Sequence, residues 1–474
     1  MVFPILRRSL SSLSSAPPPP PPDPSQTLVS TVVETLTHHR SKSRWTRLRS
    51  LSPFTPSQVS QITLRIRNNP HLALRFFLFT LRHSLSSPSL LSYSTIIHTL
   101  SRSRLLKTQT LSLIQSALLH FPDSDKTPKL FQSLVETYRE CDSAPFVFDL
   151  LIKACLTSTR IDQAMEIVRM LRSKQISPTV GTCNSVIQSV SKYHGCHAGY
   201  DVYKEVFGFG HEGKSRTRRV FKVVPNVHTY SVIMLSFYHD GLVGNVEEVW
   251  GKMVKLGCEP SRYSYCILMA AYCEDGKVWE AVKLWEEMRT KGLEPDSVAY
   301  NNMIGGFCKI GEVGRAEEFL RGMELSGVDC SCVTFEHLIN GYCQIGDVDA
   351  ALLLYKEMCR NGFKPESSTV DAVIRGLGGE NRVSEALEFL RVAIRKHEIL
   401  PKRKCYELLI KGLCQEGRME EALKLQAEMV GKGFEPNCEI YNAFIEANTK
   451  GGNVELAGIL KKEMFESQML KEEE

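Results

Sequence analysis

The sequence predicts an all-α protein, specifically an α-solenoid of stacked helix-turn-helix hairpins that form a right-handed superhelix. Three columns of residues recur at a spacing of 35 and support this prediction. A fixed period of this length is typical of repeat proteins, because one hairpin cannot bury its apolar face without a neighbour. The columns are glycines at 241, 276, 311, 346, 417 and 452, alanines at 281, 316, 351, 386, 422 and 457, and methionines at 253, 288, 323, 358, 429 and 464.

Residues 297–331 illustrate the expected hairpin. Apolar residues recur at helical spacing on both sides of Gly311, which lies where a helix end favours a left-handed residue. Ala316 is small at the point where we expect the two helices to cross closely. The apolar positions are Met303, Ile304 and Phe307 before the turn, and Val313, Ala316, Phe319, Leu320 and Met323 after it.

The same register divides most of the chain into units. One extra residue near 396–402 shifts the later units, and the second early unit is 12 residues too long. We expect an array of about nine repeats over 145–472, degenerate helical repeats over 55–144, a linker or degenerate helix over 26–54, and a disordered targeting segment over 1–25. The units are 145–179, 180–226, 227–261, 262–296, 297–331, 332–366, 367–402, 403–437 and 438–472.

The first 22 residues contain Arg7, Arg8 and five serines but no acidic residue, and the first carboxylate is Asp23. This composition is typical of an organellar transit peptide, although a disordered tail would share it. The early arginine pair favours the mitochondrion over the chloroplast. The longest apolar run, at 72–81, is interrupted by Arg75 and is too short to span a bilayer, so we expect no membrane insertion.

The net charge of +5 is distributed unevenly. Residues 1–144 contain 17 Lys and Arg against 7 Asp and Glu, whereas the remaining residues contain 41 against 46. Nucleic-acid binding by the repeat array would therefore depend on local basic patches, because its overall field repels phosphate. One such patch is an insertion at 210–224 that is either an arm for RNA phosphates or acidic partners, or a solvated loop. Its cations are Lys214, Arg216, Arg218, Arg219 and Lys222.

The 15 cysteines include no Cys-x-x-Cys motif, which argues against a zinc site. Cys273, Cys308, Cys343 and Cys414 lie at equivalent positions of their units. They could form a thiol ladder for metal or redox chemistry, or they could be small packing residues. Successive solenoid units lie on the order of 10 Å apart, beyond the reach of one metal ion. We therefore favour packing and expect no metal or cofactor.

Several segments closely resemble the pentatricopeptide repeat of plant organellar proteins. They are "PDSVAYNNMIGGFCKIGEVGRAEEFLRGMELSG" at 295–327, "PNVHTYSVIMLSFYHDG" at 225–241 and "PNCEIYNAFIEANTKGG" at 436–452. The resemblance covers 145–472 well and 55–144 weakly. It implies a conventional member of the family that lays single-stranded RNA along its inner groove, one base per repeat.

In this family the fifth and last residues of a unit read the base and the second packs against it. The resemblance thus assigns Asn301 and Ser331 to one base, with Val298 packing. Both this pair and Asn184 with Asn226 are similar to pyrimidine-preferring combinations, whereas Ser231 with Ser261 leans towards a purine. Asn442 is suitable, but its partner would be Glu472.

The other units depart from the family's pattern. Two carboxylates facing one nucleotide would repel its phosphate, so these departures weigh against long, sequence-specific reading. The departing pairs are Glu336 with Glu366, Glu407 with Asn437, Asp371 with Lys402, Cys266 with Asp296 and Asp149 with Thr179.

The sequence contains no His-x-Glu with Cys-x-x-Cys deaminase signature, no Gly-rich phosphate loop and no Gly-x-Ser-x-Gly motif. We therefore expect a monomeric binding protein rather than an enzyme. The favoured hypothesis is an organellar RNA adaptor that protects, processes or promotes translation of a transcript. The alternative is a protein–protein scaffold, such as a subunit associated with the organellar ribosome.

Overall fold

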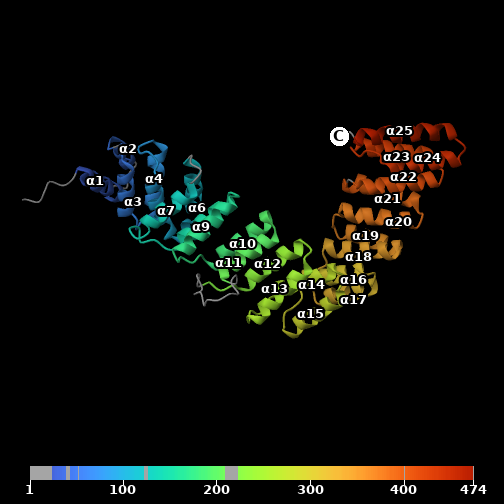
Figure 1. The fold of residues 1–474 in the computed structure, drawn as a ribbon, viewed down its shortest axis with the longest axis horizontal. Coiled ribbons are helices and arrows are strands. Elements are labelled where there is room, and N and C mark those ends of the chain that lie inside the picture. The colour runs from blue at the N-terminus through green and yellow to red at the C-terminus, as the bar shows by residue number, and fades with distance from the viewer. Residues whose placement is uncertain are drawn as a thin grey trace, which may run out of the picture. The chain divides into compact units, whose positions relative to one another are not determined.

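The computed structural model describes residues 24–38, 43–51, 53–121, 126–208, 223–399 and 401–472. Within these ranges the chain forms the helices α1 to α25 and no strand, which confirms the all-α prediction (Figure 1). The chain divides into two compact units, residues 1–225 and residues 226–474. No helix in the described ranges is long and apolar enough to cross a membrane.

The second unit is a regular solenoid of hairpins. Each first helix packs against the second helix of its own hairpin and against the first helix of the next hairpin. The first helices are α12 (Val227–His239), α14 (Arg262–Glu274), α16 (Ser297–Lys309), α18 (Cys332–Ile345), α20 (Ser367–Gly379), α22 (Arg403–Gln415) and α24 (Cys438–Lys450). The second helices are α13 (Val243–Lys255), α15 (Val278–Thr290), α17 (Val313–Leu325), α19 (Val348–Arg360), α21 (Val383–His397), α23 (Met419–Gly431) and α25 (Val454–Glu472).

The first unit begins less regularly. Its helices α3 with α4 and α5 with α6 form hairpins, whereas α7 is a single helix that packs against α5 and α9. Residues 138–145 separate α7 from α8 and are too few for another helix of the usual length. The helices are α1 (Pro24–His38), α2 (Ser43–Ser50), α3 (Pro56–Arg65), α4 (Pro70–Arg82), α5 (Leu90–Ser101), α6 (Lys107–His120), α7 (Lys126–Thr137), α8 (Phe146–Thr157), α9 (Ile161–Ser173), α10 (Val180–His194) and α11 (Cys196–Phe207), with a 3-10 turn η1 (Arg104–Leu106).

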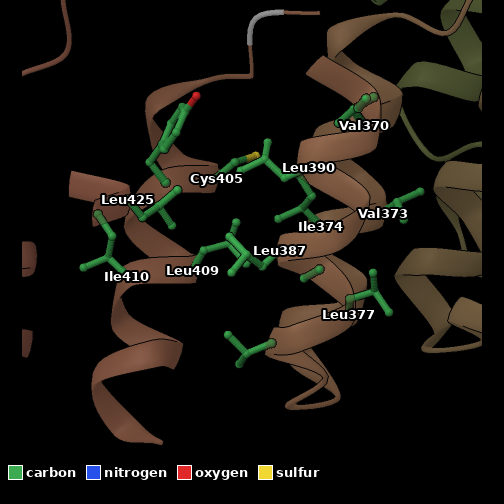
Figure 2. Packing of buried hydrophobic residues seen from close by; sticks show 14 of the residues in the cluster. Val370, Val373, Ile374, Leu377, Leu387, Leu390, Cys405, Leu409, Ile410 and Leu425 are labelled. Carbon is green, nitrogen blue, oxygen red and sulfur yellow. The ribbon is translucent and has the colours of Figure 1, made fainter. Parts of the chain in front are cut away.

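The repeated residues have the structural roles that their spacing predicts. Ala316 and Met323 are fully buried, as are their counterparts in neighbouring hairpins. Gly311 adopts a left-handed conformation with φ of 82° and turns the chain from α16 to α17. Figure 2 shows the resulting core in the hairpins that contain α20 and α22, where Leu387 and Leu390 of α21 lie between these helices.

The unit 367–402 departs from the glycine pattern. Asn381 and Glu398 take the left-handed conformation there, with φ of 57° and 55°. Asparagine tolerates this conformation, whereas glutamate has no local compensation for it. The helix that Glu398 caps, α21, has 15 residues, compared with 13 in α19. The linker that follows α21 is one residue shorter than the linker that follows α19, so the longer helix shifts the register by one residue.

Candidate functional site

The fifth residue of one unit lies beside the last residue of that unit, 30 positions further along the chain. The Asn301 side chain shows the geometry clearly, because its Nδ2 donates to Ser331 Oγ at 3.1 Å. Its Oδ1 accepts a hydrogen bond from Thr334 Oγ1 at 2.7 Å. The two residues that the family resemblance pairs are therefore in contact.

The last residue of a unit occupies the N-cap position of the next first helix, and in several units its side chain caps that helix, whereas Glu366 and Lys402 make no such hydrogen bond. The side chains of Asn226, Ser261 and Ser331 accept hydrogen bonds from the backbone N–H groups of Thr229, Ser264 and Thr334. Asparagine and serine are favoured at N-caps because they satisfy backbone donors that the helix leaves unpaired. A structural requirement thus restricts these positions to the same residue types that hydrogen-bond a base.

The candidate reading residues differ in exposure. Asn301 is half-buried, whereas Asn184 and Ser231 are only 3% and 1% exposed. Ser231 Oγ donates to Val227 O at 2.9 Å and lies 3.0 Å from Ser264 Oγ. Ser264 in turn bonds Ser261, so the Ser231 and Ser261 hydroxyls share one neighbour rather than a direct contact. Of these three side chains, Asn301 is the most accessible to a ligand.

Two further candidates have a more limited description. Asn184 belongs to the first compact unit and Asn226 to the second, so these two residues are described separately. Asn442 lines a cavity of about 280 Å³ together with Lys411 and Lys450. The side chain of its expected partner, Glu472, lies outside the described residues.

The pairs that depart from the family pattern are also in contact. Asp149 accepts hydrogen bonds from the backbone N–H and hydroxyl of Thr179, at 2.9 and 3.0 Å. Glu407 accepts one from Asn437 Nδ2 at 2.9 Å and is paired with Arg403 at 2.7 Å. These carboxylates are held by groups of the chain itself, which reduces their freedom to bond a nucleotide.

The other three departing pairs also carry acidic or thiol groups that are buried or half-buried. Asp371 is 6% exposed and accepts from Lys402 N at 3.3 Å and Cys405 Sγ at 2.9 Å. Cys266 Sγ lies 3.9 Å from Asp296 Oδ1. In a third departing pair, burial and, among further causes, the charge of Glu366 raise the pKa of Glu336.

Polar cavities lie along the first helices. One of about 430 Å³ is lined by residues of α12, α14, α16 and α18 that include Asn301, Lys309 and His337. Another of about 1030 Å³ is lined by α18, α20 and the start of α22 and includes Arg375 and Lys404. These cavities place cations next to the predicted reading positions, although the repeat array as a whole is acidic.

Val298, the packing candidate, is 52% exposed at the start of α16. Tyr263 and Val333, which occupy the equivalent position of the flanking units, are 51% and 45% exposed. Sequence reasoning named only Val298, but stepping 35 residues in each direction finds the other two. In three consecutive units, the first turn of the first helix therefore exposes a large apolar side chain to solvent.

Lys309 and Gly306 were also missed from the sequence. Lys309 Nζ donates to the carbonyl oxygen of Glu274 at 2.6 Å and lines the same cavity as Asn301. A Cβ on Gly306 would lie 2.5 Å from Cys273 Sγ, and one on Gly341 would lie 2.7 Å from Cys308 Cβ. Their 35-residue spacing is a signal for close approach of successive first helices.

The repeated thiols are packing groups, of which Cys273, Cys308 and Cys414 are buried and Cys343 is half-buried. Burial raises the pKa of Cys273, Cys308 and Cys343 to about 12 and that of Cys414 to about 11, so these side chains are protonated at neutral pH. Cys273 and Cys308 instead contact the glycines of the next first helix. Within the described ranges, no group of three His, Cys, Asp or Glu side chains could hold a metal ion.

Two sequence predictions fall outside the part of the chain that the structure describes. The basic arm, with Lys214, Arg216, Arg218, Arg219 and Lys222, lies within residues 209–222. The basic segment of the transit peptide lies within residues 1–23.

The fold and this surface define a helical-hairpin repeat protein with a polar face along its first helices. A model of the PPR repeat family matches residues 225–274, 267–309, 295–343, 331–379 and 401–439. Pentatricopeptide repeat-containing protein At2g15980 of Arabidopsis thaliana is 53% identical over 461 residues, which cover 95% of this chain and 92% of that protein. The chain belongs to the pentatricopeptide repeat family, as the sequence resemblance indicated.

Other relatives match shorter stretches or the fold at lower similarity. The protein named At4g26680, mitochondrial, of Arabidopsis thaliana is 31% identical over 153 residues, covering 32% of this chain and 29% of that protein. Among solved structures, PPR10 from maize is 15% identical with a TM-score of 0.41, covering 93% of this chain and 80% of that one. PPR10 in complex with an 18-nt psaJ RNA element is 17% identical with a TM-score of 0.42, covering 93% and 74%.

Proposed function

We propose that this chain is an organellar adaptor that binds single-stranded RNA along the first helices of its second unit. The observation that carries the proposal is the grouping around α16. The Asn301–Ser331 pair, the exposed Val298 side chain and the Lys309 cation all belong to the unit 297–331 or its boundary. An amide for a base edge, an apolar contact for a base face and a cation for phosphate are the groups that single-stranded RNA requires.

Reading of bases is concentrated, in this proposal, in the unit 297–331. Val298 supplies exposed apolar surface there, and Tyr263 and Val333 continue that surface into the units on either side. The units from 332 onwards contribute fewer free groups, because Asp371 and Glu407 are held by Lys402 and Arg403. The footprint would then be short, with stabilisation, processing or translation of a transcript as the consequence of binding.

The proposed protein is a monomer that acts by binding and not by catalysis, without a cofactor. The mitochondrion is the proposed site of action. The basic N-terminal composition supports it, as do relatives whose names include that organelle.

A filter-binding assay tests this function. Randomised single-stranded RNA is compared with double-stranded RNA of the same composition at several salt concentrations. We expect the chain to prefer the single strand and to enrich a short sequence. We also expect the affinity to fall with increasing salt concentration, with a shallow slope that corresponds to a small number of phosphate contacts. Equal binding of both RNAs, or binding that disappears near physiological salt without sequence enrichment, would favour the scaffold alternative.

A further inference from the structure

A tyrosine of the first helix usually fills the space between consecutive second helices. Tyr265 packs edge-on against Trp250 with ring centroids 4.9 Å apart. Its hydroxyl donates to Glu287 Oε1 at 2.7 Å and accepts from Lys291 Nζ at 2.8 Å. Tyr265 is therefore held on one side by an aromatic residue of the preceding second helix, α13. On the other side it is held by a carboxylate and a cation at the end of α15, the second helix of its own hairpin.

The next hairpin repeats the arrangement with different hydrogen-bond partners. Tyr300 lies 4.9 Å from Trp285, and its hydroxyl contacts Gly322 O at 3.2 Å and Ser326 Oγ at 2.9 Å. Further along, Lys432 lies 5.9 Å from the ring centroid of Tyr406. The chain thus shows which side chains surround this position when an aromatic ring fills it.

The unit 367–402 keeps the surroundings but lacks the ring. Val370 occupies the position of Tyr265, and Val392 occupies that of Glu287. Lys396 is retained in the place of Lys291, yet it is exposed and forms no ion pair with the described residues. A cation thus remains where both the aromatic ring and the carboxylate that held its equivalent have been lost.

A groove opens at this place between α19 and α21. Its volume is about 590 Å³, and its lining includes Tyr355, Val392 and Lys396, the counterparts of the residues that contact Tyr265. Leu352 and Phe389 add apolar surface. Leu377 of α20 also contributes to the lining, but the α19–α21 groove shares no lining residue with the two larger polar cavities along the first helices, to which RNA binding is assigned.

The rim of the α19–α21 groove is mainly basic. Lys356, Arg360 and Lys396 line it, together with His397, whose pKa is lowered by burial and by the charges of Lys396 and Lys364. Two carboxylates, Glu385 and Glu388, also line it, but Glu385 is held in a two-point pair by Arg382 at 2.7 and 2.9 Å. The excess positive charge over an apolar floor favours an occupant that is both aromatic and acidic.

We propose that the α19–α21 groove binds a segment of a partner protein that carries an aromatic side chain beside acidic residues. The ring would pack against Tyr355, Phe389 and Val392, and a carboxylate would pair with Lys396, which restores the contacts seen around Tyr265. RNA would bring phosphates to the same cations, but the polar edges of its bases would be desolvated against the apolar floor. The chemistry therefore favours a peptide.

The experiment is a selection from a random 12-residue peptide library displayed on phage, using the full chain, followed by anisotropy measurements on the enriched peptides. We expect enrichment of Tyr, Phe or Trp adjacent to Asp or Glu. Val370→Tyr should place a ring of the protein itself where the peptide's aromatic side chain would pack. This change should weaken peptide binding at least about tenfold. Lys396→Glu should also weaken peptide binding, because it replaces the cation that pairs with the peptide's carboxylate. Lys283→Glu on α15 should leave peptide binding unchanged.

Several outcomes would overturn the proposal. These are absence of aromatic–acidic enrichment, equal binding by the wild type and Val370→Tyr, or Lys396→Glu lowering affinity for single-stranded RNA while no peptide binds. Should Val370→Tyr fail to fold, Lys396→Glu and Lys356→Glu decide the question. Single-stranded RNA binding by Val370→Tyr serves as the control for an intact first-helix surface, so this test is independent of the proposed RNA function.

Discussion

The amide of Asn301 donates to the hydroxyl of Ser331 at 3.1 Å, across the boundary between two consecutive hairpins. Thr334 closes the arrangement by donating to the other end of the same amide at 2.7 Å. The three side chains are fixed with respect to one another before any ligand arrives. Preorganisation of this kind lowers the entropy cost of binding. It also ties a candidate reading position to the stability of the next helix.

We expect Gly306→Ala to destabilise the chain by about 1–3 kcal/mol, because overpacking between helices forces both to shift. The added Cβ would lie 2.5 Å from Cys273 Sγ. Chemical denaturation followed by circular dichroism measures the effect. Gly251→Ala in α13 is the control, since nothing lies within 4 Å of its Cβ, and it should stabilise by about 0.5–1 kcal/mol. Equal effects of the two changes would contradict close packing at Gly306.

We expect Glu398→Gly to stabilise the hairpin of α20 and α21 by roughly 1 kcal/mol, because glutamate is strained at φ of 55°. Asn381→Gly should give a smaller gain, since asparagine tolerates the left-handed region. The reverse change, Gly433→Glu at φ of 86°, should destabilise. Thermal denaturation of the three variants checks the order, and a loss of stability in Glu398→Gly would show that its side chain has another role.

The thiols of Cys273, Cys308 and Cys343 should react slowly with iodoacetamide at pH 8 in the native protein. Burial raises their pKa to about 12, so a fraction on the order of 10⁻⁴ is thiolate at that pH. Mass spectrometry of digested protein quantifies labelling, with guanidinium-unfolded protein as the control. Rapid native labelling of Cys308 would argue for a reactive thiol in place of a packing residue.

The free energy of unfolding should decrease as the pH falls from about 6.5 to about 4, in part because of His98. Burial lowers the pKa of His98 to about 4, so the unfolded chain binds a proton in this range that the folded chain does not. The contribution is up to about 1.4 kcal/mol per pH unit. The neutral ring bonds Ser143 Oγ at 2.6 Å and Leu134 O at 2.9 Å.

His98→Gln provides the comparison for this pH dependence. Glutamine keeps a neutral polar group but cannot titrate. Denaturant unfolding of both proteins between pH 4 and 7 should show a steeper decline for the wild type. Parallel curves would mean that His98 is not the source of the acid sensitivity.

The sequence was sufficient to place the hairpins of the second unit. The glycine, alanine and methionine columns set the register of the predicted units. Val227, Arg262 and Ser297, the first residues of three of these units, each begin a first helix in the structure. Local rules explain these helix starts, because a left-handed turn favours a glycine such as Gly311 and a close crossing favours a small residue such as Ala316. The single helix α7 was not foreseen, since the columns that define the register fade before residue 145.

The candidate site was harder to predict, because its properties depend on contacts between units. The burial of Ser231 follows from Ser264 in the next hairpin, and the restraint of Asp371 follows from Lys402 and Cys405. The groove beside Lys396 likewise depends on side chains that α19 and α21 bring together, such as Tyr355 and Phe389. A residue pattern gives the position of each side chain along a helix but not the partner that the next repeat supplies.

Asn301→Asp tests the central claim most directly, by sequencing the RNA retained from a random single-stranded pool by the wild type and by this variant. An aspartate keeps the acceptor for Thr334 Oγ1 and can accept from the Ser331 hydroxyl, to which the asparagine amide donates, so the fold should be unchanged, but it cannot donate to a base. Asn361→Asp at the end of α19 is the matched control. We expect the preference to change at one nucleotide with Asn301→Asp and to stay the same with Asn361→Asp. Identical preferences for all three proteins, or global unfolding of Asn301→Asp, would contradict base reading at this position.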